Sequence, residues 1–450
     1  MANVIKLRKG LDINLKGKAK DEKVNIGKSS EYALVPDNFT GVIPKVVVQE
    51  GDNVKAGDAL FVNKKFPEVK FSSPVSGTVT AVVRGDRRKV LCVKVKADDN
   101  QQFVDFGKKD VGSLDATAVK QSLLDAGLFG YINQLPYAVS TTPNTEPKAI
   151  FVSALRDMPL AGDFEMELKG NEKYFQTGLD ALSKIAKTYL GIGRKQSAEA
   201  LTSAENVEIN VFDGPCPAGN VDVQINHLDP VRKGDVVWTV DPSVVIFIGR
   251  LFDEGVVNLT RTIAIAGSMV KSPAYADVLV GTPLADILKG NIVEKGSARI
   301  INGNPLTGMK SSFDDYLGAH TSEVTVIPEG DHANELLGWI LPRFKEFSAS
   351  HSYFSWLFGK KKEYDIDARI KGGERHIIMS GEYDSVLPMD ILGEYLIKAI
   401  ITDDIDKMEQ LGIYEVAPED FALAEFVDSS KLELQRIVRE GLNMLRKENA

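Results

Sequence analysis

The sequence of 450 residues has few of the residues that several kinds of site require. Its two cysteines, Cys92 and Cys216, exclude a disulfide framework and a four-thiolate iron–sulfur site within the chain. Its five histidines stand singly, without the spacing of metal ligands. We therefore predict that the chain holds no metal ion and no iron–sulfur centre.

Long apolar runs and long basic runs are also missing. No uncharged apolar stretch reaches the roughly 18 residues that a bilayer span needs. The first residues, "MANVIKLRKGLDINLKGK", lack the apolar region of a signal peptide. The net charge is −9, and the densest basic run is the "GKKK" at 359–362. We expect a chain that has no transmembrane segment, stays in the cytoplasm and does not bind nucleic acid.

The chain is long enough for several globular domains, with 43% hydrophobic and 26% charged residues. The patterns along it favour a multidomain α/β protein in four parts. We predict a barrel-sandwich β domain over residues 1–104 and a Rossmann-like α/β domain over 105–255. A β-grasp domain with extra strands follows over 256–385, and a helical domain over 386–450 ends the chain.

The first part contains "QEGDNVKAGD" at 49–58, which predicts two tight turns because glycine adopts positive φ and aspartate caps a turn. Alternating apolar residues around it predict short strands over one core. Followed by "SSPVSG", this order resembles the lipoyl and biotinyl carrier fold, in which a lysine at a hairpin tip holds the cofactor. Lys64 and Lys65 stand near that point, but "FPE" follows them instead of Met, Asp or Ala. We predict a structural barrel, with a modified lysine as the alternative.

The second part alternates strand and helix patterns, which argues for an α/β layer with parallel pairing. We predict a helix that ends near Gly127, a strand in "EPKAIFVSA" and a helix over 171–191. We predict a further strand in "NVEINVFDG", and we count the apolar runs "DVVWTV" and "VVIFIGRLF" with the strands.

A flavin or dinucleotide site on such a layer needs glycines at the first strand-to-helix turn. Here the first strand is followed by "LRDMPLAGDF", with Met158 and Pro159 where glycine is needed. The glycines of "YLGIGRK" follow a predicted helix and do not precede one. We predict an α/β layer without a phosphate-binding loop.

The third part, "TRTIAIAGSMVKSPAYADVLVGTPLADIL", predicts two strands around a proline turn and a short helix capped by Thr282. This order resembles the soluble-ligand-binding β-grasp (SLBB) domain. Beyond Pro388, apolar residues recur at helical spacing, and we expect Ser429 or Ser430 to cap the last helix.

Several longer motifs, spread over the whole chain, carry a resemblance to a known family. They are "EPKAIFV", "GPCPAG" at 214–219, "GNPLTG" at 303–308, "VTVIPEG" at 324–330, "LLGWI" at 336–340, "PMDI" at 388–391 and "LGIYEVAPEDFALAEFVD" at 411–428. In this order they resemble the NqrA family, which belongs to the Na⁺-translocating NADH:quinone oxidoreductases. The sequence departs from the family pattern at Cys216, where the family tends to have "GPHPAG".

The resemblance implies a cofactor-free subunit, peripheral on the cytoplasmic side of the bacterial inner membrane. Its complex would reduce ubiquinone or menaquinone with NADH and export Na⁺. Flavins and iron–sulfur centres would belong to other subunits, and the partners would be membrane-embedded and NADH-oxidising subunits. No catalytic, cofactor-binding or metal-binding residue is predicted in this chain. The alternative is a flavin-binding electron-transfer subunit like RnfC, which shares the scaffold with the flavin-bearing subunit of complex I.

An aromatic cluster lies within "SASHSYFSWLFGKKKEY" at 348–364, directly before a run of lysines. Its residues are Tyr353, Phe354, Trp356, Leu357 and Phe358. One interpretation is an internal plug under the β-grasp domain, since such a patch rarely stays exposed. The others are a docking element for a membrane-embedded partner and direct lipid contact, with the lysines towards lipid phosphates.

The stretch "GLFGYINQLPY" at 127–137 is a second candidate surface. Because the resemblance implies quinone reduction, an aromatic segment bounded by proline is a candidate lining for an apolar cleft. We predict Phe129, Tyr131 and Tyr137 as candidate quinone contacts.

Overall fold

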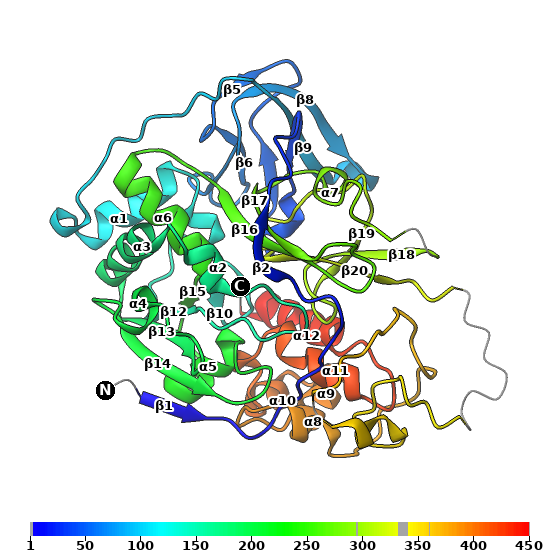
Figure 1. Ribbon diagram of the computed structural model, residues 1–450. Coiled ribbons are helices and arrows are strands. Elements are labelled where there is room, and N and C mark those ends of the chain that lie inside the picture. Colours follow the sequence, from blue (N-terminus) through cyan, green and yellow to red (C-terminus); the bar gives the residue numbers. More distant parts are fainter. Residues whose placement is uncertain (1–2, 294–295, 332–340, 360, 450) are drawn as a thin grey trace.

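The computed structural model describes residues 3–293, 296–331, 341–359 and 361–449. The "LLGWI" motif at 336–340 lies outside these residues. Figure 1 shows the β barrel at the top, the α/β layer at the left, the β-grasp sheet at the right and the C-terminal helices below.

The barrel consists of two small antiparallel sheets. The first contains, in order, β3 (Glu31–Leu34), β9 (Val90–Ala97), β8 (Gly77–Arg84) and β5 (Asn53–Val54), and the second contains β4 (Pro44–Val46), β6 (Ala59–Asn63) and β7 (Lys70–Ser72). The predicted turns are confirmed, because Gly51 and Gly57 have φ of 94° and 102°. Lys64 and Lys65 are exposed in the turn between β6 and β7.

The α/β layer is built on a seven-stranded sheet, counted over the described residues. Its order is β1 (Asn3–Lys6), β14 (Glu208–Asp213), β13 (Thr188–Gly193), β12 (Ala149–Ser153), β15 (Val237–Thr239), β10 (Asn133–Leu135) and β11 (Val139–Ser140). The first five strands are parallel, as the sequence predicted for part of the layer, and the last two pair antiparallel. The helices are α1 (Ala116–Asp125), α2 (Phe164–Leu168), α3 (Glu172–Ile185), α4 (Glu199–Thr202), α5 (Val221–Leu228) and α6 (Pro242–Glu254).

Two predictions in this layer were wrong. The helix predicted over 171–191 ends at Ile185, and Tyr189 to Gly193 belong to strand β13, so the glycines of "YLGIGRK" end a strand. The chain turns extended at Ala186, whose φ is −157°. The run "VVIFIGRLF" forms the buried helix α6, because Asp241 caps it and Pro242 stands at its first position.

The β-grasp sheet has six strands among the described residues. Its order is β19 (Met309–Ser311), β18 (Ala298–Asn302), β20 (Glu323–Pro328), β16 (Thr260–Ala266), β17 (Ala274–Leu279) and β2 (Lys20–Val24). The short helix α7 (Leu284–Ile287) is not capped by Thr282, whose hydroxyl donates to the carbonyl of Leu279 at 2.7 Å.

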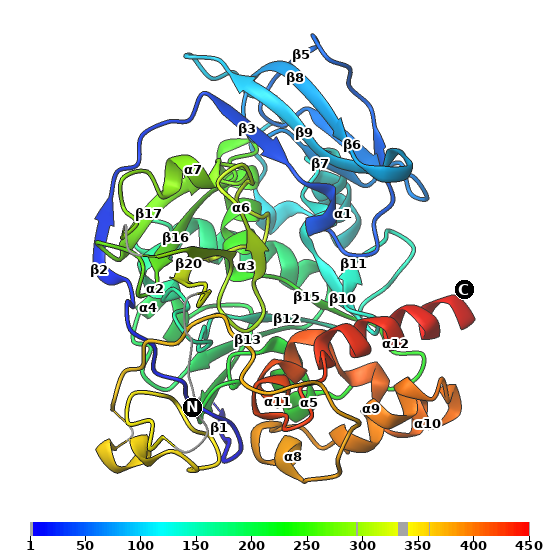
Figure 2. The same ribbon diagram turned by 90° about the vertical axis from the view of Figure 1, so that its right-hand side faces the viewer.

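The first 24 residues run outside the barrel. Strand β1 joins the α/β sheet beside β14, and β2 joins the β-grasp sheet beside β17. The blue N-terminal segment of Figure 2 follows this path along both layers. These residues, which we assigned to the barrel domain, therefore also supply strands to two other layers. The predicted domain boundaries at residues 104, 255 and 385 remain predictions.

The C-terminal helices lie under the α/β sheet. They are α8 (Glu382–Val386), α9 (Gly393–Ile401), α10 (Ile405–Gln410), α11 (Ala422–Val427) and α12 (Leu434–Glu448). Neither serine predicted to cap α12 does so: Glu433 precedes the helix, and the hydroxyl of Ser430 donates to the carbonyl of His376 at 3.1 Å.

Both faces of the α/β sheet are covered, each by a different core. Ile150 and Val152 of β12 belong to the core shared with the barrel and helices α3 and α6. Phe151, between them, belongs to the core shared with the C-terminal helices. Because successive side chains of a strand point to opposite faces, β12 links the two cores.

Candidate functional site at the crevice of the α/β sheet

The crevice at the carboxyl ends of β12 and β15 is where an open parallel sheet binds ligands. The chain runs from β12 outward through β13 to β14, and then returns to the other side of β12 as β15. This reversal is a topological switch point. Two segments leave the sheet there: the loop at 154–163 after β12, and the start of α6 after β15.

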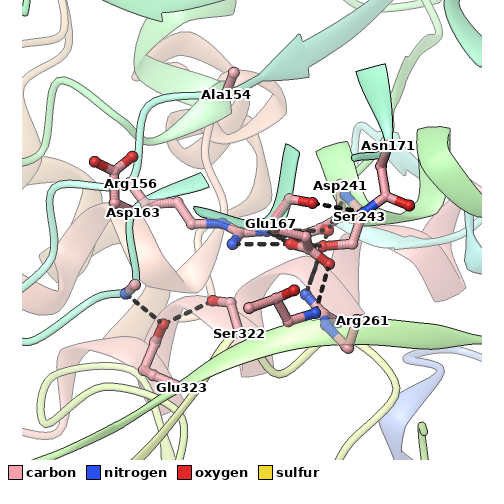
Figure 3. A network of polar contacts seen from close by, with 12 residues as sticks. Ala154, Arg156, Asp163, Glu167, Asn171, Asp241, Ser243, Arg261, Ser322 and Glu323 are labelled. Atoms are coloured by element: carbon pink, nitrogen blue, oxygen red, sulfur yellow. Dashed lines mark hydrogen bonds and ion pairs between the residues drawn. The ribbon is translucent and has the colours of Figure 1, made fainter. Parts of the chain in front are cut away.

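A buried carboxylate, Glu167 of α2, forms the centre of the crevice (Figure 3). Its side chain is 2% exposed. Both terminal nitrogens of Arg156 donate to its Oε2 at 3.2 Å, and the Ser243 hydroxyl donates to the same oxygen at 2.7 Å. The backbone N–H of Thr262 donates to Oε1 at 3.2 Å. Glu167 is therefore hydrogen-bonded on both oxygens.

The second carboxylate, Asp241, occupies the N-terminus of α6. Its Oδ1 accepts the backbone N–H of Ser243 at 2.8 Å and lies 3.6 Å from a terminal nitrogen of both Arg156 and Arg261. Burial raises the pKa of Asp241, but the charges of Arg261 and Arg156 outweigh burial and hold that pKa below its usual value. A helix N-terminus attracts anions, and here the chain supplies its own anion.

The same network joins the α/β layer to the β-grasp sheet. Arg261 of β16 donates from Nη2 to the Ser243 hydroxyl at 2.9 Å, and Arg156 donates to that hydroxyl at the same distance. Beside it, the hydroxyl of Tyr275 accepts the backbone N–H of Asp163 at 2.8 Å. Two guanidinium groups thus face two carboxylates. A phosphate bound to these guanidinium groups would have to displace one of the carboxylates.

The glycines at the end of β13 are covered by side chains. A Cβ added at Gly191 would lie 1.9 Å from Oε1 of Gln224, and one at Gly193 would lie 2.7 Å from Cδ1 of Leu155. These glycines allow close packing against α5 and the loop after β12. They do not line an open cradle for phosphate.

The predicted quinone contacts do not form one group. Phe129 and Tyr131 lie together in a buried 3-10 helix, Phe129–Tyr131. Tyr137 lies in the β10–β11 turn against α12, where its backbone carbonyl accepts from Arg439 at 2.8 Å. The structure therefore separates Tyr137 from the other two.

Tyr131 lies where the barrel, the α/β layer and the β-grasp domain meet. Its ring centroid is 5.0 Å from that of Phe39 and 5.7 Å from that of His320. The Tyr131 hydroxyl, His320 Nε2 and Arg261 Nε are buried without a hydrogen-bond partner among the described residues. Burial lowers the pKa of His320 to about 4, so its ring is neutral near pH 7.

Sequence reasoning missed most of this crevice. Arg156, Glu167, Arg261 and His320 are far apart in the sequence and belong to no motif. One signal was available, because "DPS" at 241–243 places a capping aspartate and a first-turn proline before an apolar run.

The aromatic cluster at 353–358 is not an internal plug. The side chains of Phe354, Trp356, Leu357 and Phe358 are 47% to 61% exposed, and Tyr353 is half-buried. Residues Phe354–Phe358 form a 3-10 helix in which Ser355 is the buried residue.

Over the described ranges, no cluster of three or more His, Cys, Asp or Glu side chains could hold a metal ion. Cys216 is buried, and burial raises the pKa of its thiol. Within the part of the chain that the structure describes, no helix is both long and apolar enough to cross a bilayer.

The fold and the crevice define a class of protein: a barrel-sandwich, α/β and β-grasp scaffold whose ligand crevice is filled by its own charged side chains. Three family models match the chain in this order. They describe an NqrA N-terminal barrel-sandwich hybrid domain at residues 5–98, an NqrA second alpha/beta domain at 114–257 and an NQRA C-terminal domain at 262–312.

Relatives that are named as the A component of Na(+)-translocating NADH-quinone reductase match along the full length. Those of Yersinia pestis bv. Antiqua, Neisseria meningitidis serogroup B and Saccharophagus degradans are 33%, 32% and 34% identical, each over 99% of this chain and 100% of the relative. The chain therefore belongs to the NqrA family. Two solved structures of a NAD⁺-reducing [NiFe]-hydrogenase superpose with TM-scores of 0.36 and 0.37, at 14% and 11% identity, over 75% and 77% of this chain and 62% and 67% of those chains. These scores are too low to inform function.

Proposed function

We propose that this chain is the NqrA component of a complex that reduces a quinone with NADH and couples the reaction to Na⁺ transport. It lies on the cytoplasmic side of the bacterial membrane, bound to membrane-embedded and NADH-oxidising subunits. Full-length similarity to relatives of that name carries this proposal.

Within the complex, the chain acts as a scaffold without a cofactor of its own. The filled crevice supports this role, because Asp241 and Glu167 stand where a flavin phosphate would bind, already paired with Arg156 and Arg261. Flavins and iron–sulfur centres then belong to other subunits. The RnfC-like alternative requires that a flavin displace these ion pairs.

Membrane vesicles from a strain that lacks this chain test the main proposal. We expect them to keep NADH oxidation with an artificial acceptor while they lose Na⁺-dependent quinone reduction. Expression of the wild-type chain restores it. If the purified chain by itself oxidised NADH and held flavin, the scaffold role would be wrong and the RnfC-like function would replace it.

A second role concerns the quinone, and the unpaired polar atoms at Tyr131 favour it. A quinone carbonyl accepts hydrogen bonds, and the Tyr131 hydroxyl and His320 Nε2 are buried without partners among the described residues, beside aromatic rings. We propose that the head group binds at this junction, with Phe129 behind Tyr131.

Steady-state kinetics of the assembled complex test this role. Loss of one hydrogen bond is worth about 0.5–1.5 kcal/mol, so Tyr131→Phe is expected to raise the KM for quinone roughly 2- to 12-fold. Tyr137→Phe serves as the matched control and is expected to leave KM unchanged. Equal effects of the two substitutions would contradict the assignment.

A further inference from the structure

The segment that follows residue 340 carries an apolar patch that is about half exposed among the described residues. We name it the aromatic patch: Leu341, Phe344, Phe354, Trp356, Leu357 and Phe358, each 45% to 61% exposed. The ring of Phe344 lies 6.1 Å from those of both Phe354 and Phe358, so the two halves of the segment meet. Figures 1 and 2 show this yellow segment at the lower edge of the molecule.

Basic residues alternate with the aromatic residues along this segment, and two of them lie over aromatic rings. Arg343 lies over the ring of Tyr353 at 5.4 Å, and Lys362 lies over the ring of Phe358 at 4.3 Å. Lys345 and Lys361 are exposed. The chain as a whole has a net charge of −9, so this concentration of positive charge is local.

Three acidic residues of the described segment lie near these basic groups in the sequence, and each has a defined place. Glu346 forms an ion pair with Lys371, outside the patch. Glu363 and Asp365 are exposed on either side of Tyr364, whose backbone N–H and carbonyl bond to Asn14 and Lys16 at 2.8 and 2.9 Å. They therefore mark the point where the segment returns to the body of the protein.

The patch is held by a packed base. The ring of Phe347 lies 5.2 Å from that of Tyr364 and 5.7 Å from that of Phe426 of α11. Phe347 and Tyr364 belong to the core shared with the C-terminal helices. Substitutions on the exposed side of the segment therefore leave this anchoring contact in place.

We propose that the aromatic patch inserts into the headgroup layer of an anionic phospholipid bilayer. Tryptophan and other aromatic rings favour that layer, and the exposed Lys345 and Lys361 can meet lipid phosphates. Because the rest of the chain is acidic, it is repelled by the same surface, which turns this face towards the membrane. The inference rests on the proposed function as part of a membrane complex, and it adds lipid as a partner of its own.

Co-sedimentation of the purified full chain with lipid vesicles tests the inference. We expect binding to vesicles of phosphatidylcholine with about one third phosphatidylglycerol, little binding to pure phosphatidylcholine, and weaker binding as salt rises. The double variant Trp356→Ser/Leu357→Ser and the charge variant Lys345→Glu/Lys361→Glu should each reduce binding to anionic vesicles at least tenfold.

Matched controls keep the comparison specific. Phe313 is 50% exposed on the β-grasp side, and Lys55 is exposed on the barrel, so Phe313→Ser and Lys55→Glu should bind as the wild type does. Unchanged thermal unfolding shows that the variants fold.

Two results would overturn the inference. One is equal binding by the wild type and the Trp356→Ser/Leu357→Ser variant. The other is that the wild type does not bind vesicles, while the Trp356→Ser/Leu357→Ser variant is lost from native membranes that hold the complex. That result would assign the patch to a protein partner. Quinone reduction by the assembled complex reports on the proposed function separately, because vesicle binding needs no other protein.

Discussion

The crevice and the aromatic patch are opposite in construction. In the crevice, buried charges of one sign meet charges of the other, and Glu167 is bonded on both oxygens. In the aromatic patch, apolar side chains such as Trp356 and Leu357 face outward. The charged groups of the crevice are thus paired within the chain, whereas the apolar groups of the patch are about half exposed.

We expect the largest loss of stability when an ion pair of the crevice is broken. Glu167→Gln removes one negative charge that faces Arg156 and leaves buried guanidinium groups without full compensation. Removing one partner of a buried ion pair costs about 3–5 kcal/mol. Urea unfolding should show a loss of that size, whereas Glu172→Gln, at an exposed position of α3, should change stability by less than about 0.5 kcal/mol. A loss below about 1 kcal/mol for Glu167→Gln would contradict the pairing.

A third region differs from both, because it buries two carboxyl groups that form no ion pair among the described residues. Asp222 of α5 and Asp420 are both buried where the α/β layer meets the C-terminal helices. Burial, followed by the charge of Glu419, raises the pKa of Asp420 to about 7. Burial, followed by the charge of Asp420, raises the pKa of Asp222 well above its usual value.

These raised pKa values make the stability of the protein depend on pH. When the folded-state pKa of a carboxyl lies above its unfolded value, the folded protein binds more protons, and stability falls as pH rises. For Asp420 this window runs from about pH 4 to pH 7. Asp222→Asn removes the repulsion, so its urea midpoint should fall less between pH 5 and pH 8 than that of the wild type. Other titrating groups contribute equally to both proteins, so they cancel in the difference between the two urea midpoints. Parallel curves of urea midpoint against pH would rule out the coupling between Asp222 and Asp420.

The smallest effect is expected for a substitution in the aromatic patch. Trp356→Ser should lower the free energy of unfolding by about 1 kcal/mol or less, because about half of the side chain is already exposed. Trp238→Ser, at a fully buried tryptophan of β15, should cost several kcal/mol. Thermal unfolding of the two variants makes the comparison, and a large loss for Trp356→Ser would mean that the ring is packed.

Sequence patterns predicted much of the fold because they reflect local constraints. The turns at Gly51 and Gly57 follow from positive φ, and β12 and β15 follow from short apolar runs. Helix α6 was mistaken for a strand because nearly all of its residues are buried, so its sequence contains a continuous apolar run that suits either element. Only its cap, Asp241 before Pro242, distinguishes it.

The crevice could not be predicted in the same way. Arg156, Glu167, Ser243 and Arg261 lie on four segments that the sheet topology brings together, and single charged residues in a sequence give no indication of a partner. The absence of a glycine-rich loop after β12 was visible in the sequence. That the space holds two ion-paired carboxylates follows only from the three-dimensional arrangement.

Flavin titration of the purified full chain tests the central claim most directly. Because Asp241 and Glu167 occupy the crevice, we predict no bound flavin after purification and no saturable quenching of FMN fluorescence up to about 1 mM, a limit that corresponds to binding of about 4 kcal/mol. Saturable FMN binding to the wild type that Arg156→Ala abolishes would contradict the claim that the chain has closed this site.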